Sequence, residues 1–203
     1  MKKDFHREDG MEFTDVETAE TRAMKEEARY KNIYGEEVRA GNEILHFKRV
    51  NLFDDKFSVM LPDSYKDLPK DLAKLKYPHE NRPHVIKTNE ATTANFAFSL
   101  YGQDFSEAQV ESATNGMKSG LGRVTSGARF FDTVFTNTED GVKFGYFDFL
   151  TTGLDMEMYQ MFGFIPVHGK FLHVIFNAPA AMMRTWQPVA VQTLRSVRGI
   201  EEN

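Results

Sequence analysis

The stretch RFFDTVFTNTEDGVKFGYFDFLTTGLDMEMYQMFGFIPVHGKFLHVIFN, residues 129–177, decides the fold class. It holds four strand-like runs, at Arg129–Asn137, Val142–Thr151, Leu154–Ile165 and Lys170–Asn177. Short turn sequences separate these runs, at Glu139–Gly141, Thr152–Gly153 and His168–Gly169. Because connections this short join antiparallel neighbours, the stretch predicts successive hairpins in an antiparallel sheet.

Several of these strands are apolar on both faces. Phe144 and Tyr146 alternate with Phe147 and Phe149, so neither side of this strand suits contact with water. Such strands need cover on both sides of the sheet. Apolar residues at helical spacing predict that cover at about 106–124 and about 180–197.

The chain before residue 129 adds further strands and a distinct beginning. We expect strands at 43–50, 57–62, 85–88 and 92–100, and a short helix at 67–75. Residues 1–41 are rich in Glu, Lys and Arg, and Thr14 to Glu17 have the spacing of a capping box. The sequence therefore predicts a partly helical N-terminal extension, 1–41, and one α+β domain, 42–203. Its antiparallel sheet has about six to seven strands, with helices on both faces.

This order of elements resembles the PsbP-like superfamily, which includes DcrB-like bacterial proteins. The small motifs that support the resemblance are Leu61-Pro62, Asn177-Ala178-Pro179, Trp186-Gln187-Pro188 and Leu194-Arg195-Ser196-Val197. The resemblance covers about residues 43–198 and implies an α/β/α sandwich. It also implies a non-catalytic surface that binds protein partners, and it supplies no catalytic residue to carry over. The acidic N-terminal extension and the loop at 77–83 depart from the pattern.

Composition excludes several classes of function. The formal net charge of −5 lacks the basic excess with which proteins replace counterions on nucleic acids, and it disfavours binding to anionic membranes. The chain has no cysteine, which removes disulfides, thiolate nucleophiles and thiolate metal sites. The first nine residues have no apolar core of a secretory signal. We therefore expect a cytoplasmic protein that binds neither nucleic acid nor membrane.

Motif tests predict no metal, no cofactor and no catalytic centre. His79 and His84 share one loop, but a catalytic zinc site takes three protein ligands. Gly120-Leu121-Gly122 ends a predicted helix, whereas a phosphate-binding loop opens one. Asp148, Asp155 and Glu157 could form an acid/base pair, but Asp155 and Glu157, two residues apart on one strand face, also have the pattern of a solvated face.

The loop Tyr77-Pro78-His79-Glu80-Asn81-Arg82-Pro83 holds the residues that we select for partner binding: Tyr77, Arg82 and Pro83. Tyr and Arg are enriched at binding hot spots, and prolines reduce the entropy lost on ordering. The alternative is a purely structural turn in which Tyr77 packs on the core.

Two functions follow from these observations. The first is a non-catalytic protein-binding or adaptor module. The second is a small-molecule or lipid-binding protein, enzymes included, with an aromatic and Met-lined pocket against the sheet. Methionines 156, 158, 161, 182 and 183 suit either a core or such a pocket. An enclosed apolar cavity favours the second function, and a filled core with an exposed apolar surface favours the first.

Overall fold

The computed structural model describes residues 31–40, 43–152 and 156–201. The helix predicted to begin at Thr14 falls almost wholly on residues outside these ranges, as does the predicted turn residue Gly153.

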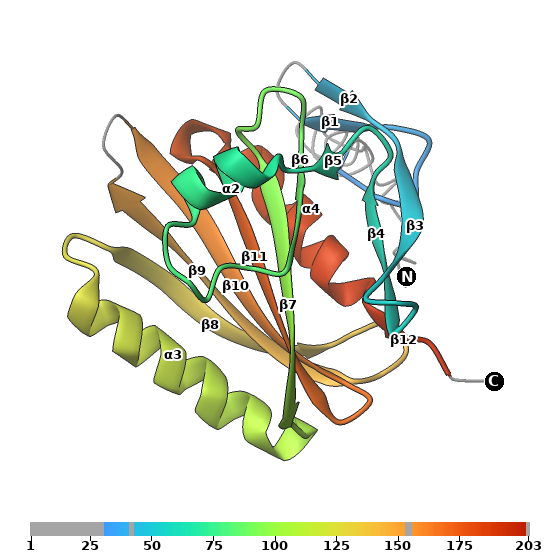
Figure 1. Ribbon diagram of the computed structural model, residues 1–203, viewed down its shortest axis with the longest axis vertical. Coiled ribbons are helices and arrows are strands. Elements are labelled where there is room, and N and C mark those ends of the chain that lie inside the picture. Colours follow the sequence, from blue (N-terminus) through green and yellow to red (C-terminus); the bar gives the residue numbers. More distant parts are fainter. Residues whose placement is uncertain (1–30, 41–42, 153–155, 202–203) are drawn as a thin grey trace, which may run out of the picture.

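An antiparallel sheet of seven strands forms the centre of the molecule (Figure 1). Its spatial order is β5-β6-β7-β11-β10-β9-β8, and every neighbouring pair is antiparallel. The strands are β5 (Lys66–Asp67), β6 (Val85–Thr88), β7 (Asn95–Asp104), β8 (Arg129–Asn137), β9 (Lys143–Thr152), β10 (Glu157–Val167) and β11 (Lys170–Pro179). The sheet predicted from residues 129–177 is thus confirmed, and β8 to β11 follow one another as hairpins.

The first strands of the chain form separate small sheets. β1 (Val38–Ala40) pairs with β2 (Glu43–Leu45), while β3 (Phe47–Leu52), β4 (Phe57–Pro62) and β12 (Arg198–Gly199) make a three-stranded sheet. The single strand expected at 43–50 is therefore two strands with a break at His46. The expected strand at 57–62 is present, but it lies outside the main sheet.

Helices cover both faces of the main sheet. α2 (Lys70–Lys76) and α3 (Val110–Val124) lie on one face, and α4 (Met183–Arg195) lies on the other (Figure 1). Single 3₁₀ turns, Glu107–Gln109 and Ala180–Met182, precede α3 and α4. Two glycines permit the close approach: a Cβ on Gly145 would meet the Thr114 side chain of α3. A Cβ on Gly163 would come within 2.8 Å of Leu194 in α4.

Aromatic rings fill the core under α4. Trp186 is 2% exposed, and its ring centroid lies 5.2 Å from that of Phe176 and 6.2 Å from that of Phe96. Tyr65 closes the group from the loop after β4, at 6.3 Å from the Trp186 ring. Stacked and edge-on rings at these separations add to the stabilisation from burial. This face of the sheet is therefore packed.

The residues just before β2 belong to this core. Ile33, Val38 and Ala40 are at most 2% exposed and pack with the α4 side of the sheet. The Gln192 side chain of α4 also donates to the Lys31 carbonyl at 2.6 Å and accepts the Ile33 amide at 3.2 Å. Residues 33–40 therefore pack on the domain, while the predicted division at residue 41 stays a prediction. The sequence shows little sign of this packing, because only three short apolar side chains mark the segment.

Within the described ranges, no helix is long and apolar enough to cross a membrane. The cytoplasmic location stays a prediction.

Candidate functional site

Three side-chain amides form a row across the middle of the main sheet. Asn95 of β7 is the direct cross-strand partner of Asn177 in β11, and Asn177 is the partner of Gln160 in β10. The next row along the strands, Ala97, Ile175 and Phe162, has the same orientation. Because cross-strand partners project from the same face, all three amides lie on the face that carries α2 and α3.

Hydrogen bonds connect two of these amides to α2. Asn95 donates through Nδ2 to Asn177 Oδ1 at 2.7 Å, and Asn177 donates through Nδ2 to the Tyr77 hydroxyl, also at 2.7 Å. Asn95 is only 2% exposed, and its Oδ1 has no hydrogen-bond partner. A buried acceptor without a donor is costly, and this one lies beneath the exposed surface of the sheet, where it has no accessible area.

An open groove of about 510 Å³ lies over this row, and we call it the amide groove. Its walls come from the end of α2, the loop before β7 and the start of β10. The lining residues are Lys76, Tyr77, Ala91, Thr92, Thr93, Asn95, Met156, Met158, Gln160, Phe162, Ile175, Asn177 and Pro179. Met156 is 53% exposed at the rim, and Met158 is half-buried.

The polar groups of the amide groove are almost all neutral. Burial raises the pKa of the Tyr77 hydroxyl, so this group stays protonated at neutral pH and can donate. Gln160 donates to Thr151 Oγ1 at 2.8 Å through its Nε2, which leaves its carbonyl oxygen to accept. The Lys76 ammonium donates to the Thr92 carbonyl, and burial lowers its pKa. The groove therefore suits a neutral group with both donors and acceptors, next to an apolar part.

The three residues predicted for partner binding do not face one hollow. Tyr77 lines the amide groove, whereas Arg82 and Pro83 line a separate depression on the other side of α2. Arg82 Nε donates to the Tyr77 carbonyl at 3.3 Å, and Pro83 is buried. The Tyr77 ring packs on Ile86 and Ala97. Both contacts fit the structural alternative, so a binding role for Arg82 and Pro83 stays a prediction.

The other chemical motifs lie apart from the groove. Glu157 forms an ion pair with Arg129, while Asp148 is buried on the α4 face, where it accepts from Tyr159 and Gln187. Asp148 is 3% exposed, whereas Glu157 is exposed, as expected for a solvated face; Asp155 lies outside the described residues. Among described residues, no three His, Asp or Glu side chains group as metal ligands.

The methionines divide between the two expected environments. Met161 is 1% exposed in the core under α4, and Met182 and Met183 pack against that core. Met156 and Met158 instead line the amide groove. The core role is therefore confirmed for Met161, Met182 and Met183, and a binding role for Met156 and Met158 stays a prediction.

Sequence reasoning missed Asn95 and Gln160. In strand 92–100 the conspicuous face is the apolar one that Ala94, Phe96, Phe98 and Leu100 share. Its other face carries Asn95, Ala97 and Ser99, which are small or polar. A central strand with large apolar side chains on one face and small or polar side chains on the other indicates that fewer residues cover the second face. This pattern could have located the groove.

The element order, the sheet order and the two helical layers define a Mog1p/PsbP-like fold. No protein-family model matches the sequence, and comparison with curated protein sequences finds no relative. The Saccharomyces cerevisiae Ran-binding protein Mog1p superposes with a TM-score of 0.54 at 10% identity, over 77% of this chain and 97% of that chain. The cyanobacterial PsbP (CyanoP) of Synechocystis sp. PCC 6803 gives 0.54 at 12% identity, over 80% and 97%. Likeness at these identities establishes the fold and leaves function to the site.

Proposed function

We propose that the chain is a non-catalytic protein-binding module that holds an extended segment of its partner in the amide groove. The observation that carries this proposal is the open groove with exposed Met156 at its rim and a row of neutral amides on its floor.

The chemistry of the floor matches a polypeptide main chain. A peptide unit offers one N–H and one C=O, and the groove offers an acceptor at the Gln160 side-chain carbonyl and a donor at the Tyr77 hydroxyl. Phe162 and Ile175 lie in the row next to the amides and provide an apolar surface against which one side chain of the segment can pack. Methionine adapts its shape to irregular partners, which suits Met156 and Met158 to the rim of such a site.

The shape of the groove also favours a macromolecular partner. The groove is open to solvent, so a segment of a larger partner can reach the amides on its floor. The core under α4 is filled by side chains such as Phe96, Phe176 and Trp186, whereas the face that carries α2 has an open groove. Mog1p, a protein of similar fold, is named for binding Ran, so the architecture can serve protein recognition.

A second function has one specific observation in its favour. The groove combines neutral polar groups with the apolar side chains of Phe162 and Ile175, a lining that would also suit a compact apolar molecule with a hydroxyl or amide. Native mass spectrometry of the purified chain separates the two, because a resident small molecule adds a fixed mass that disappears on denaturation.

The proposal is tested by affinity capture from native lysate with two matched variants. Met156→Lys places a charge at the groove, and Val124→Lys places the same charge on a 79% exposed valine at the end of α3. We expect partner recovery to fall at least about tenfold with the first variant, which is the effect of losing roughly 1.4 kcal/mol of binding free energy. It should be unchanged with the second. Equal recovery with both variants would remove the groove from the binding surface.

A further inference from the structure

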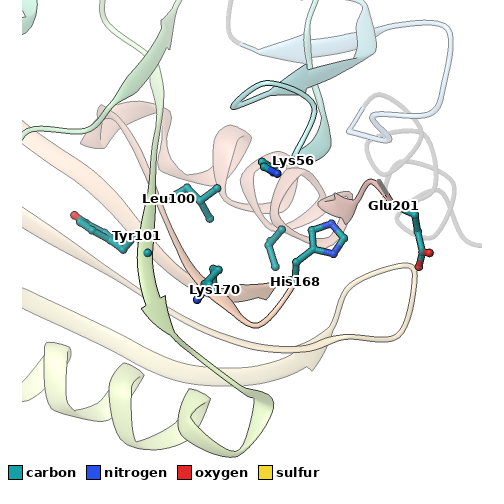
Figure 2. Close-up of a pocket in the computed structure, with 8 residues that line it drawn as sticks. Lys56, Leu100, Tyr101, His168, Lys170 and Glu201 are labelled. Carbon is teal, nitrogen blue, oxygen red and sulfur yellow. The ribbon is translucent and has the colours of Figure 1, made fainter. Parts of the chain in front are cut away.

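A second hollow, of about 660 Å³, lies at the opposite end of β7 and β11 from the amide groove. It opens between the main sheet and the three-stranded sheet (Figure 2). On β7, Asn95 lies at the amide groove and Tyr101 lies at this second hollow. Because six residues of a strand span about 20 Å, the two sites are about that far apart. The lining residues are Lys56, Leu100, Tyr101, Gly102, Val167, His168, Lys170 and Glu201. We call it the basic hollow.

Two hairpin tips at this hollow have an unusual backbone. Phe53, Asp54 and Asp55, in the turn that leads to Lys56, have φ angles of 57°, 51° and 62°, and His168 has a φ of 47°. Residues other than glycine occupy this left-handed region at a cost, and they persist there where the surrounding structure holds them. Both tips are therefore fixed in place rather than free loops.

The contacts that fix the tips are visible on each side. The Ile200 amide donates to the Lys56 carbonyl at 3.1 Å, and the Phe105 amide donates to the Gly169 carbonyl at 2.7 Å. The His168 ring lies directly on Gly199, where an added Cβ would come within 2.9 Å of its Nε2. These contacts hold Lys56, His168 and Lys170 around one space (Figure 2).

The charge of this space runs against that of the whole chain. Lys56 and Lys170 line the hollow with Glu201 as its one acidic lining residue, although the chain carries a net charge of −5. Lys170 pairs with Asp104 at 2.7 Å, but Asp104 is 94% exposed, so this bridge is weak and an incoming anion can replace it. Leu100 and Val167 add an apolar wall between the cations.

We propose that the basic hollow binds a small organic anion, with an apolar body against Leu100 and Val167 and a carboxylate or phosphate head between Lys56, His168 and Lys170. The apolar wall distinguishes this ligand from an inorganic ion, and the cations distinguish it from a neutral apolar molecule. The site is independent of the peptide proposed for the amide groove, because no residue lines both.

The test is a titration of the full chain followed by amide NMR shifts, with octanoate, octyl phosphate, octan-1-ol and inorganic phosphate as probes. We expect octanoate and octyl phosphate to shift the amides of Gly102, Gly169 and Lys56. Their dissociation constants should be at least about tenfold lower than those of octan-1-ol and phosphate, since a charge-assisted hydrogen bond contributes that much. The better of the two anions identifies the head group.

Matched double variants decide whether the basic residues carry the binding. Lys56→Gln with Lys170→Gln should weaken octanoate binding about tenfold or more. Lys70→Gln with Lys74→Gln, which removes two exposed charges from α2, should leave it unchanged. The proposal would be overturned if both pairs weakened binding equally, or if octan-1-ol bound as tightly as octanoate. It would also be overturned if about 10 mM of either anion, a concentration above the millimolar range of weak ligands, shifted none of these amides.

Discussion

The two faces of strand β11 have different roles. Toward α4, residues Leu172, Val174, Phe176 and Ala178 are all buried. Toward α2 and α3, burial stops partway along the strand, and Ile175 and Asn177 are only half-buried. The difference comes from the lengths of the two helices on this face. The helix α3 has 15 residues and lies over β8 to β10, whereas α2 has seven residues. A short helix leaves part of a two-faced sheet open, and the open part carries the amides.

This contrast assigns stability to one face and binding to a part of the other. Substitutions under α4 should lower the free energy of unfolding with little selective effect on partner binding. Substitutions at the amide groove should do the reverse.

Trp186→Ala should have the largest effect. Its side chain is 2% exposed among the Tyr65, Phe96 and Phe176 rings, so its removal leaves a cavity that neighbours cannot fill. We expect a loss of about 3–5 kcal/mol in the free energy of unfolding, measured by urea denaturation. A loss below about 1 kcal/mol, the size of an ordinary surface change, would show that the α4 face is not the main core.

Ile33→Ala tests whether residues 33–40 belong to this core. Ile33 is 1% exposed and packs with the α4 side, so we expect a loss of about 2–4 kcal/mol. The same denaturation experiment on Ile44→Ala, at a 59% exposed position in β2, provides the control and should change stability by less than about 0.5 kcal/mol. Equally small losses of stability in Ile33→Ala and Ile44→Ala would support a domain that begins near residue 41.

His173 gives the packed part of the α2–α3 face a pH dependence. Burial among the Phe162, Phe164 and Phe171 rings lowers its pKa to about 4, against an ordinary value of 6.5. The unfolded chain therefore takes up a proton between pH 6.5 and pH 4 that the folded chain refuses. Stability is full above pH 6.5 and should fall by about 2 kcal/mol between pH 7 and pH 4.5 from this group.

The control for this effect is His173→Leu, which removes the titrating group. We expect the variant's unfolding free energy to lose about 2 kcal/mol less than the natural chain over the same pH range. Parallel pH profiles for the two proteins would mean that His173 is solvated in the folded state.

The sequence predicted the sheet more fully than it predicted the site, for a physical reason. Alternating runs and short turns are local, so the hairpins from Arg129 to Asn177 could be derived without knowing any distant contact. The amide row joins Asn95, Asn177 and Gln160 from strands that meet only through the register of the fold. Tyr77 was selected from its loop, but its bond to Asn177, 100 residues away, could not be derived.

Tyr77→Phe should have a small effect on stability. The change keeps the ring that packs on α2's side of the sheet and removes the hydroxyl that accepts from Asn177. One lost hydrogen bond should cost about 1 kcal/mol in thermal or chemical unfolding. Partner recovery should fall further than this loss explains, because the groove also loses its hydroxyl donor; recovery that follows stability alone would make Tyr77 purely structural.

The most direct test of a binding face beside a packed face is site-specific crosslinking. A photoreactive phenylalanine analogue is placed at Met156 in the amide groove and, separately, at Val124 on α3, both exposed positions where substitution should change stability by less than about 0.5 kcal/mol. Illumination in native lysate, followed by mass spectrometry, identifies the attached protein. The proposed function predicts one enriched protein adduct from position 156 and none from position 124. The same adducts from both positions, or an adduct from position 124 alone, would contradict it.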